Sequence, residues 1–100
     1  MLKHVVMWQL KDSALGMDKP ALAAEMKKRL ESLVGKVPSI RAFEVGLNVV
    51  QSDGCRDIVL VSSFDDEAGL QAYVVHPDHQ EVVAFVKQVV QERRAVDYPA

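Results

Sequence analysis

The sequence has 100 residues, 49% hydrophobic and 26% charged, which predicts one globular domain over residues 1–100. The formal net charge is −2, with bases scattered among acids, so we expect no nucleic-acid partner. The single cysteine, Cys55, excludes an intramolecular disulfide framework and favours a cytoplasmic location. The N-terminal apolar run is too short for a signal peptide or a membrane-spanning helix, so we expect no membrane association.

The first predicted element is a strand over residues 2–10. Side chains alternate along it between two sets, which are Leu2, His4, Val6, Trp8 and Leu10 on one face and Lys3, Val5, Met7 and Gln9 on the other. Both sets contain apolar residues, whereas a strand with one solvated face would show polar residues on that face. We therefore expect both faces of this strand to be covered.

An amphipathic helix is predicted from Asp18 to about Gly35. Asp18 suits the N-cap position, and Pro20 fits the first turn because its missing N–H would lack a partner there in any case. Two strands follow, over residues 40–50 and 58–64, and are joined by a polar loop that contains Cys55. No histidine lies near Cys55 in the sequence, so we interpret it as an incidental free thiol.

Two short helices and a final strand complete the chain. Asp65 and Asp66 are suitable caps for a helix through Leu70, Tyr73 and Val74. Pro77 begins a second helix, predicted to end near Glu92, because proline fits the first turn and interrupts a helix that is already under way. Residues 95–98 are predicted to form the last strand.

The order β-α-β-β-α-α-β predicts an α+β, ferredoxin-like fold with an antiparallel four-stranded sheet. Helices can cover only one face of this sheet, while two of its strands are apolar on both faces. The uncovered face needs a partner, so we expect a homodimer with the two sheets facing each other. The residues expected on the buried face between the sheets are Val5, Met7, Val45, Val59 and Val61.

Tyr73 and His79, on either side of Pro77, are the candidate catalytic residues. A neutral imidazole in the first turn of a helix can accept a proton, and a phenol can donate a hydrogen bond to a carbonyl or enolate. The candidate binding residues are His4, Trp8 and His76, of which His76 also suits a cap at the helix joint. Two alternatives are that these are core side chains bonded to the backbone, or that His4, His76 and His79 bind a metal. The chain has no acidic partner at a spacing that would support a metal, so we expect neither metal nor cofactor.

Three segments resemble the stress-responsive A/B-barrel (Dabb) family of dimeric α+β proteins. They are residues 2–6, residues 73–79, in which Tyr73 is followed by His76, Pro77 and His79, and residues 96–98. The resemblance implies a dimeric α/β barrel. A similar plant member is a polyketide cyclase of the olivetolic acid type, and its catalytic tyrosine and histidine correspond by position to Tyr73 and His79. His4 matches a pocket histidine of that protein, whereas Met7 and Trp8 add bulk that could fill or reshape the pocket.

Three functions follow as expectations. In the first, a homodimer binds a small hydrophobic or carbonyl-containing molecule between sheet and helices without turnover. In the second, a cofactor-free cyclase, lyase or isomerase acts on an enolisable carbonyl compound through Tyr73 and His79. In the third, which rests on fold analogy alone, the protein is a cofactor-free monooxygenase. An open cavity lined by His4, Tyr73 and His79 would favour the second, and a filled core there would favour the first.

Overall fold

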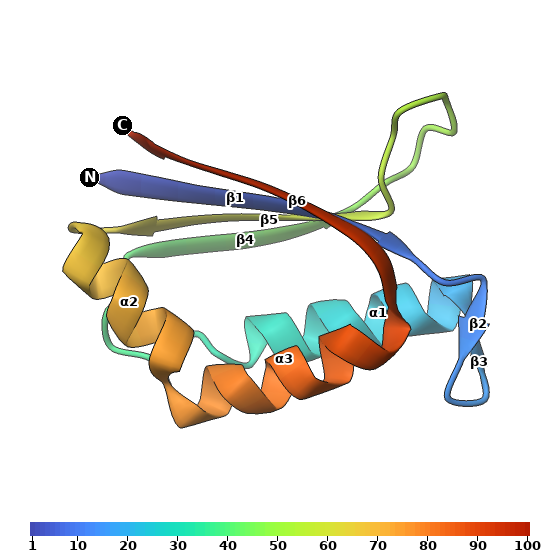
Figure 1. Cartoon of the computed structure of the whole chain (residues 1–100), viewed down its shortest axis with the longest axis horizontal. Helices are drawn as coiled ribbons and strands as arrows, with labels where there is room; N and C mark the ends of the chain where they lie inside the picture. The colour runs from blue at the N-terminus through green and yellow to red at the C-terminus, as the bar shows by residue number, and fades with distance from the viewer.

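A computed structural model describes residues 1–100 and arranges them in two layers, a four-stranded sheet and three helices on one of its faces (Figure 1). The sheet has the order β4-β5-β1-β6, and every neighbouring pair is antiparallel. Its strands are β1 (Leu2–Leu10), β4 (Ala42–Leu47), β5 (Ile58–Phe64) and β6 (Val90–Pro99). The predicted order of helices and sheet strands and the antiparallel four-stranded sheet are confirmed.

The helices are α1 (Lys19–Glu31), α2 (Glu67–Val75) and α3 (Pro77–Val89). The predicted N-cap of α1 is confirmed, because the Asp18 carboxylate accepts a hydrogen bond from the Ala21 amide at 3.0 Å. Asp66 caps α2 in the same way, through the Gly69 amide at 2.9 Å. None of the three helices is long and apolar enough to span a membrane.

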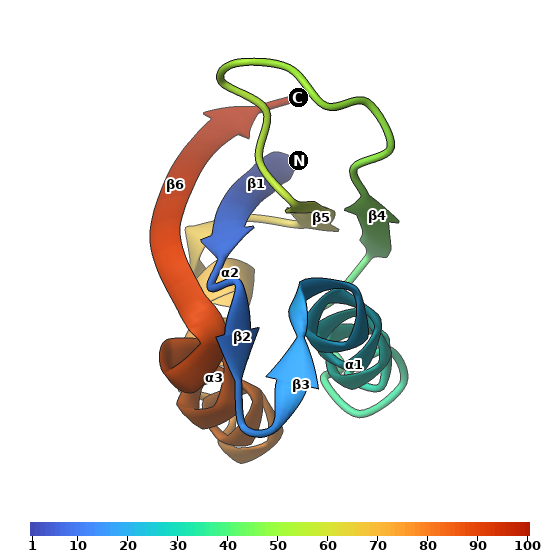
Figure 2. The ribbon, with the colours of Figure 1, turned by 90° about the vertical axis from the view of Figure 1, so that its right-hand side faces the viewer.

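Two local features differ from the prediction. Residues 11–16, which lie between the first predicted strand and the first predicted helix, belong to a hairpin of β2 (Ser13–Ala14) and β3 (Met17–Asp18), which lies across the ends of α1 and α3 (Figure 2). Its turn places Leu15 and Gly16 at φ values of 53° and 76°, in the left-handed region. The second difference is that α3 ends at Val89 rather than near Glu92, because Val90 and Glu92 already pair with β1.

The strand registers determine which side chains face the helices. Val45, Leu60 and Val6 lie opposite one another on successive strands, and all three are buried in the core beneath the helices. The prediction that Val45 lies on the face away from the helices is therefore wrong. A shift of one residue in the pairing of a strand exchanges its two faces. The apolar residues of β4 do not by themselves specify which of its faces meets α1.

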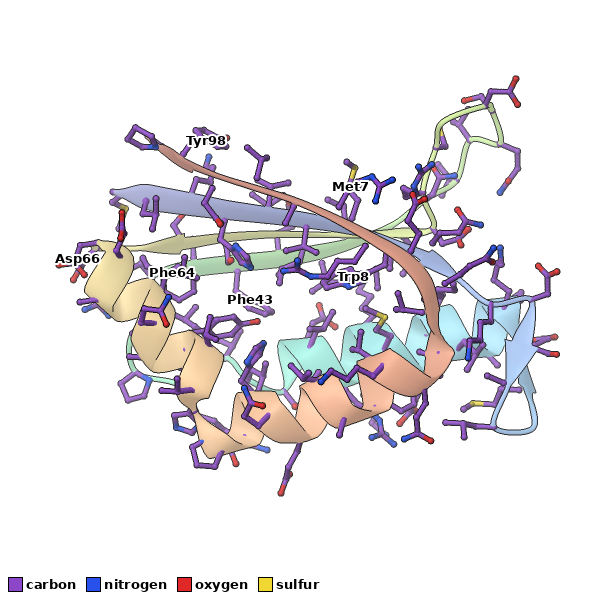
Figure 3. All side chains as sticks on the ribbon, viewed as in Figure 1. Met7, Trp8, Phe43, Phe64, Asp66 and Tyr98 are labelled. Atoms are coloured by element: carbon purple, nitrogen blue, oxygen red, sulfur yellow. The ribbon has the colours of Figure 1, made fainter.

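The other face of the sheet has no helix over it. Figure 3 shows Met7 and Tyr98 on this side, whereas Trp8, Phe43 and Phe64 point toward the helices. Met7, Val96 and Tyr98 are 42%, 55% and 41% exposed, which is unusual for large apolar side chains on a sheet. We call this surface the outer face, and its apolar residues are Val5, Met7, Val59, Val61, Val96 and Tyr98. The prediction that Val5, Met7, Val59 and Val61 lie away from the helices is confirmed.

Candidate functional site

The joint between α2 and α3 brings the two candidate catalytic residues together. The backbone of His76 is extended, at φ −61° and ψ 134°, because a residue before proline avoids the helical region. Its imidazole Nδ1 accepts a hydrogen bond from the Asp78 amide at 3.1 Å and so caps α3. The chain changes direction at this point, and the rings of Tyr73 and His79 come to a centroid separation of 4.1 Å.

Tyr73 is the centre of a cluster of aromatic rings. The His4 ring lies edge-on to it at 6.3 Å, and the rings of Phe64 and Phe43 lie at 5.2 and 6.3 Å. Only 1% of the Tyr73 surface and 7% of the His4 surface is exposed. The structure therefore gathers Tyr73, His79 and His4 from two helices and one strand, as the sequence predicted.

A cavity of about 590 Å³ adjoins this cluster, between the sheet and the helices. His4 and Trp8 of β1 line it, together with Tyr73 of α2, His79 of α3 and Arg93 of β6. Nine of its 14 lining residues are hydrophobic, so it suits a small apolar molecule with a few polar groups. The predicted binding residue Trp8 is thus placed in the wall, where its indole N–H is buried without a hydrogen-bond partner.

The environment of His79 favours a neutral imidazole. Burial lowers the pKa of His79, and nearby positive charges, including that of Arg93, lower it further against an opposing backbone hydrogen bond. That bond joins Nδ1 to the carbonyl oxygen of Val74 at 3.0 Å. Since a carbonyl only accepts, Nδ1 carries the hydrogen and donates it. In the neutral ring Nε2 then has a free lone pair, and His79 can accept a proton there.

Tyr73 has the complementary property. Burial raises the pKa of the Tyr73 phenol, although the positive charge of Arg93 acts in the opposite direction, so the hydroxyl keeps its proton at neutral pH. No side-chain hydrogen bond of the structure involves this hydroxyl, and the residue lines the cavity. A donor in this position is available to a carbonyl oxygen of a bound molecule.

Two residues of β6 belong to the site and were not predicted as members of it. Asp97 lies opposite His4 in the strand register, and its carboxylate forms a short hydrogen bond with Nδ1 of His4, which orients that ring. Arg93 lies opposite Trp8 and lines the cavity. Alternation along residues 93–97 was the available signal, since Arg93 and Asp97 share one face of a strand. Arg93 was missed because the final strand was expected to begin only at residue 95. Asp97 lies within the expected strand, but its contact with His4 depends on the register between β6 and β1.

The remaining candidates lie elsewhere or form no cluster. His76 does not line the cavity, and its ring serves as the cap of α3. His4, His76 and His79 do not form a group of side chains able to hold a metal ion. Cys55 is exposed in the loop between β4 and β5, with its sulfur 3.0 Å from the Ser52 hydroxyl.

The lowered pKa of His79 leads to a pH prediction. We expect the His79 imidazole to titrate below its usual value of 6.5 in a histidine proton NMR titration. Because the unfolded chain then binds this proton more readily than the folded chain does, the free energy of unfolding should decrease as the pH falls from 6.5 through the folded-state pKa. The His79→Ala variant identifies which NMR resonance belongs to His79. Its melting temperature should decrease less than that of the wild type as the pH is lowered. A midpoint at or above 6.5 in the wild type would contradict the neutral ring.

Comparisons with known proteins place the chain among similar sequences and folds. Residues 2–100 match the family model of the stress responsive A/B barrel domain. An uncharacterized protein of Streptomyces coelicolor is 30% identical over 88 residues, which cover 88% of this chain and 89% of that protein. A crystal structure from Bacteroides fragilis, described as a dimeric protein of unknown function with a ferredoxin-like fold, is 32% identical with a TM-score of 0.82. The alignment covers 97% of this chain and 93% of that one.

A third similar structure is the hydroxynitrile lyase from Passiflora edulis. It has a TM-score of 0.79 at 14% identity, with 97% of this chain and 90% of that chain covered. At this identity the similarity shows the shared fold alone. Together with the Bacteroides structure, it confirms the ferredoxin-like α+β fold predicted from the order of elements.

Proposed function

The chain belongs to the stress responsive A/B barrel domain family, and we propose that it acts as a cofactor-free lyase, cyclase or isomerase on a small, apolar, enolisable carbonyl compound. The observation that carries this proposal is the cavity of about 590 Å³, into which both Tyr73 and His79 project as lining residues. A filled core at this position would have favoured a binding protein without turnover. The open cavity, with a neutral base beside a protonated phenol, favours proton transfer.

The proposed step is removal of a proton from the carbon next to the carbonyl group. Nε2 of His79 takes the proton, and the electrons of the broken C–H bond move into a carbon–carbon double bond. The carbonyl oxygen then becomes negatively charged, and the Tyr73 hydroxyl donates a hydrogen bond to it. The resulting enolate can be protonated again, close a ring or expel a leaving group, according to the substrate. Nine of the 14 lining residues are hydrophobic, and both polar contacts are stronger beside such a wall than in water.

The similarity to the hydroxynitrile lyase and the monooxygenase alternative bear differently on this proposal. The Passiflora edulis enzyme shows that this fold carries lyase chemistry in a distant protein, which is compatible with the proposal and does not identify a substrate here. The monooxygenase alternative has only the fold in its favour. Binding without turnover shares the same cavity, and the experiment below separates it from catalysis.

We further propose that the working unit is a homodimer in which two outer faces meet. Four apolar residues of this surface, Val5, Met7, Val59 and Val61, surround the centre of the sheet without a helix above them. The loop after β4 rises on the same side of the sheet (Figure 1), and its Val49 is 88% exposed. Covering this surface would remove apolar groups from water, and the similar Bacteroides fragilis protein is described as dimeric.

Deuterium exchange tests the catalytic proposal without knowledge of the natural substrate. 4-Phenylbutan-2-one is apolar, enolisable and small enough for the cavity. We expect the protein to accelerate the loss of its α-proton NMR signals in D₂O, with a rate that saturates as the ketone concentration rises. Trp8, the chain's single tryptophan, lines the cavity and reports binding independently through its fluorescence. Binding without exchange would support the non-catalytic alternative, and absence of both for a panel of such ketones would contradict the proposal.

A further inference from the structure

The cavity wall contains an arginine that no carboxylate of the protein neutralises. Arg93 lines the cavity and forms no ion pair, whereas each of the other four arginines has a carboxylate partner. These pairs are Arg29 with Glu25, Arg41 with Asp65, Arg56 with Glu92 and Arg94 with Glu92. An arginine directed at an apolar cavity without a carboxylate is therefore the exception in this chain.

The strand register explains why Arg93 stays unpaired. Arg93, Ala95 and Asp97 share the face of β6 that is turned toward the helices, opposite Trp8, Val6 and His4. The carboxylate on this face, Asp97, is already bonded to His4. The backbones of Arg93 and Asp97 are four residues apart, roughly 13 Å along a strand. The next residue, Arg94, points to the outer face, where it lies opposite Met7.

A second cation also lines the cavity. Lys87 of α3 lines it and forms no ion pair. Eight residues separate Lys87 from His79, which corresponds to about 12 Å along a helix. The positive charge of Arg93 also lowers the pKa of His79, secondary to the effect of burial, so this guanidinium acts on the interior of the cavity. The wall that contains Tyr73 and His79 thus also contains two cations without a carboxylate partner.

We propose that the ligand of this cavity is a keto acid whose carboxylate is bound by Arg93, with Lys87 as a second positive charge, while its carbonyl group meets Tyr73 and His79. This inference rests on the proposed function and adds the charge of the substrate to it. A guanidinium binds a carboxylate through two parallel hydrogen bonds, a geometry that an ammonium group cannot supply. The hydrophobic wall accommodates a carbon chain between the carboxylate and the carbonyl.

The surroundings favour a single negative charge over a phosphate. Lys87 lies in the last turn of α3 and Val90 directly follows this helix, so the negative end of the helix dipole is close by. Such a position is less favourable for a dianion than for a monoanion. A carboxylate matches the available charge better.

The test compares an acid with its uncharged amide at constant shape. Trp8 fluorescence is titrated with 4-phenylbutanoate and with 4-phenylbutanamide. We expect the wild type to bind the acid about tenfold or more tightly than the amide, as expected for a charge-assisted hydrogen bond at the rim of a cavity. Arg93→Gln should weaken acid binding by about tenfold and leave amide binding unchanged. High salt should reduce the preference for the acid, because Arg93 is exposed to solvent as well as lining the cavity.

Arg94→Gln is the matched control, since Arg94 neighbours Arg93 on β6 and points to the opposite face. It should change neither affinity, and melting curves show whether each variant is folded. Equal affinities of acid and amide for the wild type, or equal losses in Arg93→Gln and Arg94→Gln, would overturn the inference and leave the proposed function standing. If neither compound binds and 4-phenylbutan-2-one shows neither binding nor exchange, both proposals fail together.

Discussion

His79→Ala is expected to slow deuterium exchange into 4-phenylbutan-2-one by about 10²- to 10⁴-fold, the usual contribution of a positioned acid or base. Its cost in stability should be small, at about 1 kcal/mol for one lost hydrogen bond. The carbonyl oxygen of Val74, which Nδ1 of His79 contacts, also accepts a hydrogen bond from Gln80 and so keeps a partner in the variant. The measurements are the exchange rate by NMR and the melting temperature.

Tyr73→Phe should reproduce the loss of exchange with even less effect on folding. The ring stays in contact with Phe64 and His4, and the hydroxyl that it loses has no hydrogen-bond partner in the protein. Tyr98→Phe is the matched control, because Tyr98 is the second of the chain's two tyrosines and lies on the outer face. It should exchange deuterium at the wild-type rate.

His76→Asn provides the corresponding control for His79→Ala. Asparagine is a good N-cap, so the variant keeps an acceptor for the Asp78 amide while it loses the imidazole. We expect near wild-type exchange. If His79→Ala and Tyr73→Phe instead lower the melting temperature by many degrees and no ketone binds to the wild type, these residues are core side chains, and the site proposal is wrong.

Val59→Asp is expected to convert the proposed homodimer into a monomer or to cause aggregation. Val59 lies in the middle of the outer face, between Gly46 of β4 and Met7 of β1. In a dimer of facing sheets the side chain of residue 59 is buried. An unpaired carboxylate there would make the free energy of association less favourable by several kcal/mol, on the order of the cost of burying a polar group without a partner. Light scattering at micromolar concentration gives the mass directly.

Val34→Asp is the matched control for this change. Val34 is equally aliphatic and 55% exposed, but it follows α1 on the helical side of the molecule. The variant should keep the mass of the wild type. A monomeric wild type at micromolar concentration would contradict the dimer, and so would an unchanged mass in Val59→Asp.

The sequence by itself determined the elements that depend on neighbouring residues. Asp18 and Asp66 cap helices through amides three residues later, and Pro77 begins α3 as predicted. These are local contacts, so composition and spacing are enough to predict them. The turn at Leu15 and Gly16 is local as well, but a non-glycine residue with positive φ has little signature in the sequence.

The candidate site shows the same division. Tyr73 and His79 were predicted because one short stretch with a proline joint carries both. His4 was placed with them from the alternation of β1 and from the family resemblance, and the structure confirms that the three rings lie together. The end of α3 was predicted too late, because apolar residues up to Val90 continue a helical spacing while their pairing with β1 favours a strand.

Only the tertiary structure decided the face of Val45, the bond between Asp97 and His4, the unpaired charge of Arg93 and the presence of a cavity. Asp97 and His4 are 93 residues apart, and they meet because β6 pairs with β1 in one particular register. A shift of that register by one residue would turn Asp97 and Arg93 to the outer face. Register depends on how the whole sheet packs against the helices, so no local pattern of residues 90–99 specifies it.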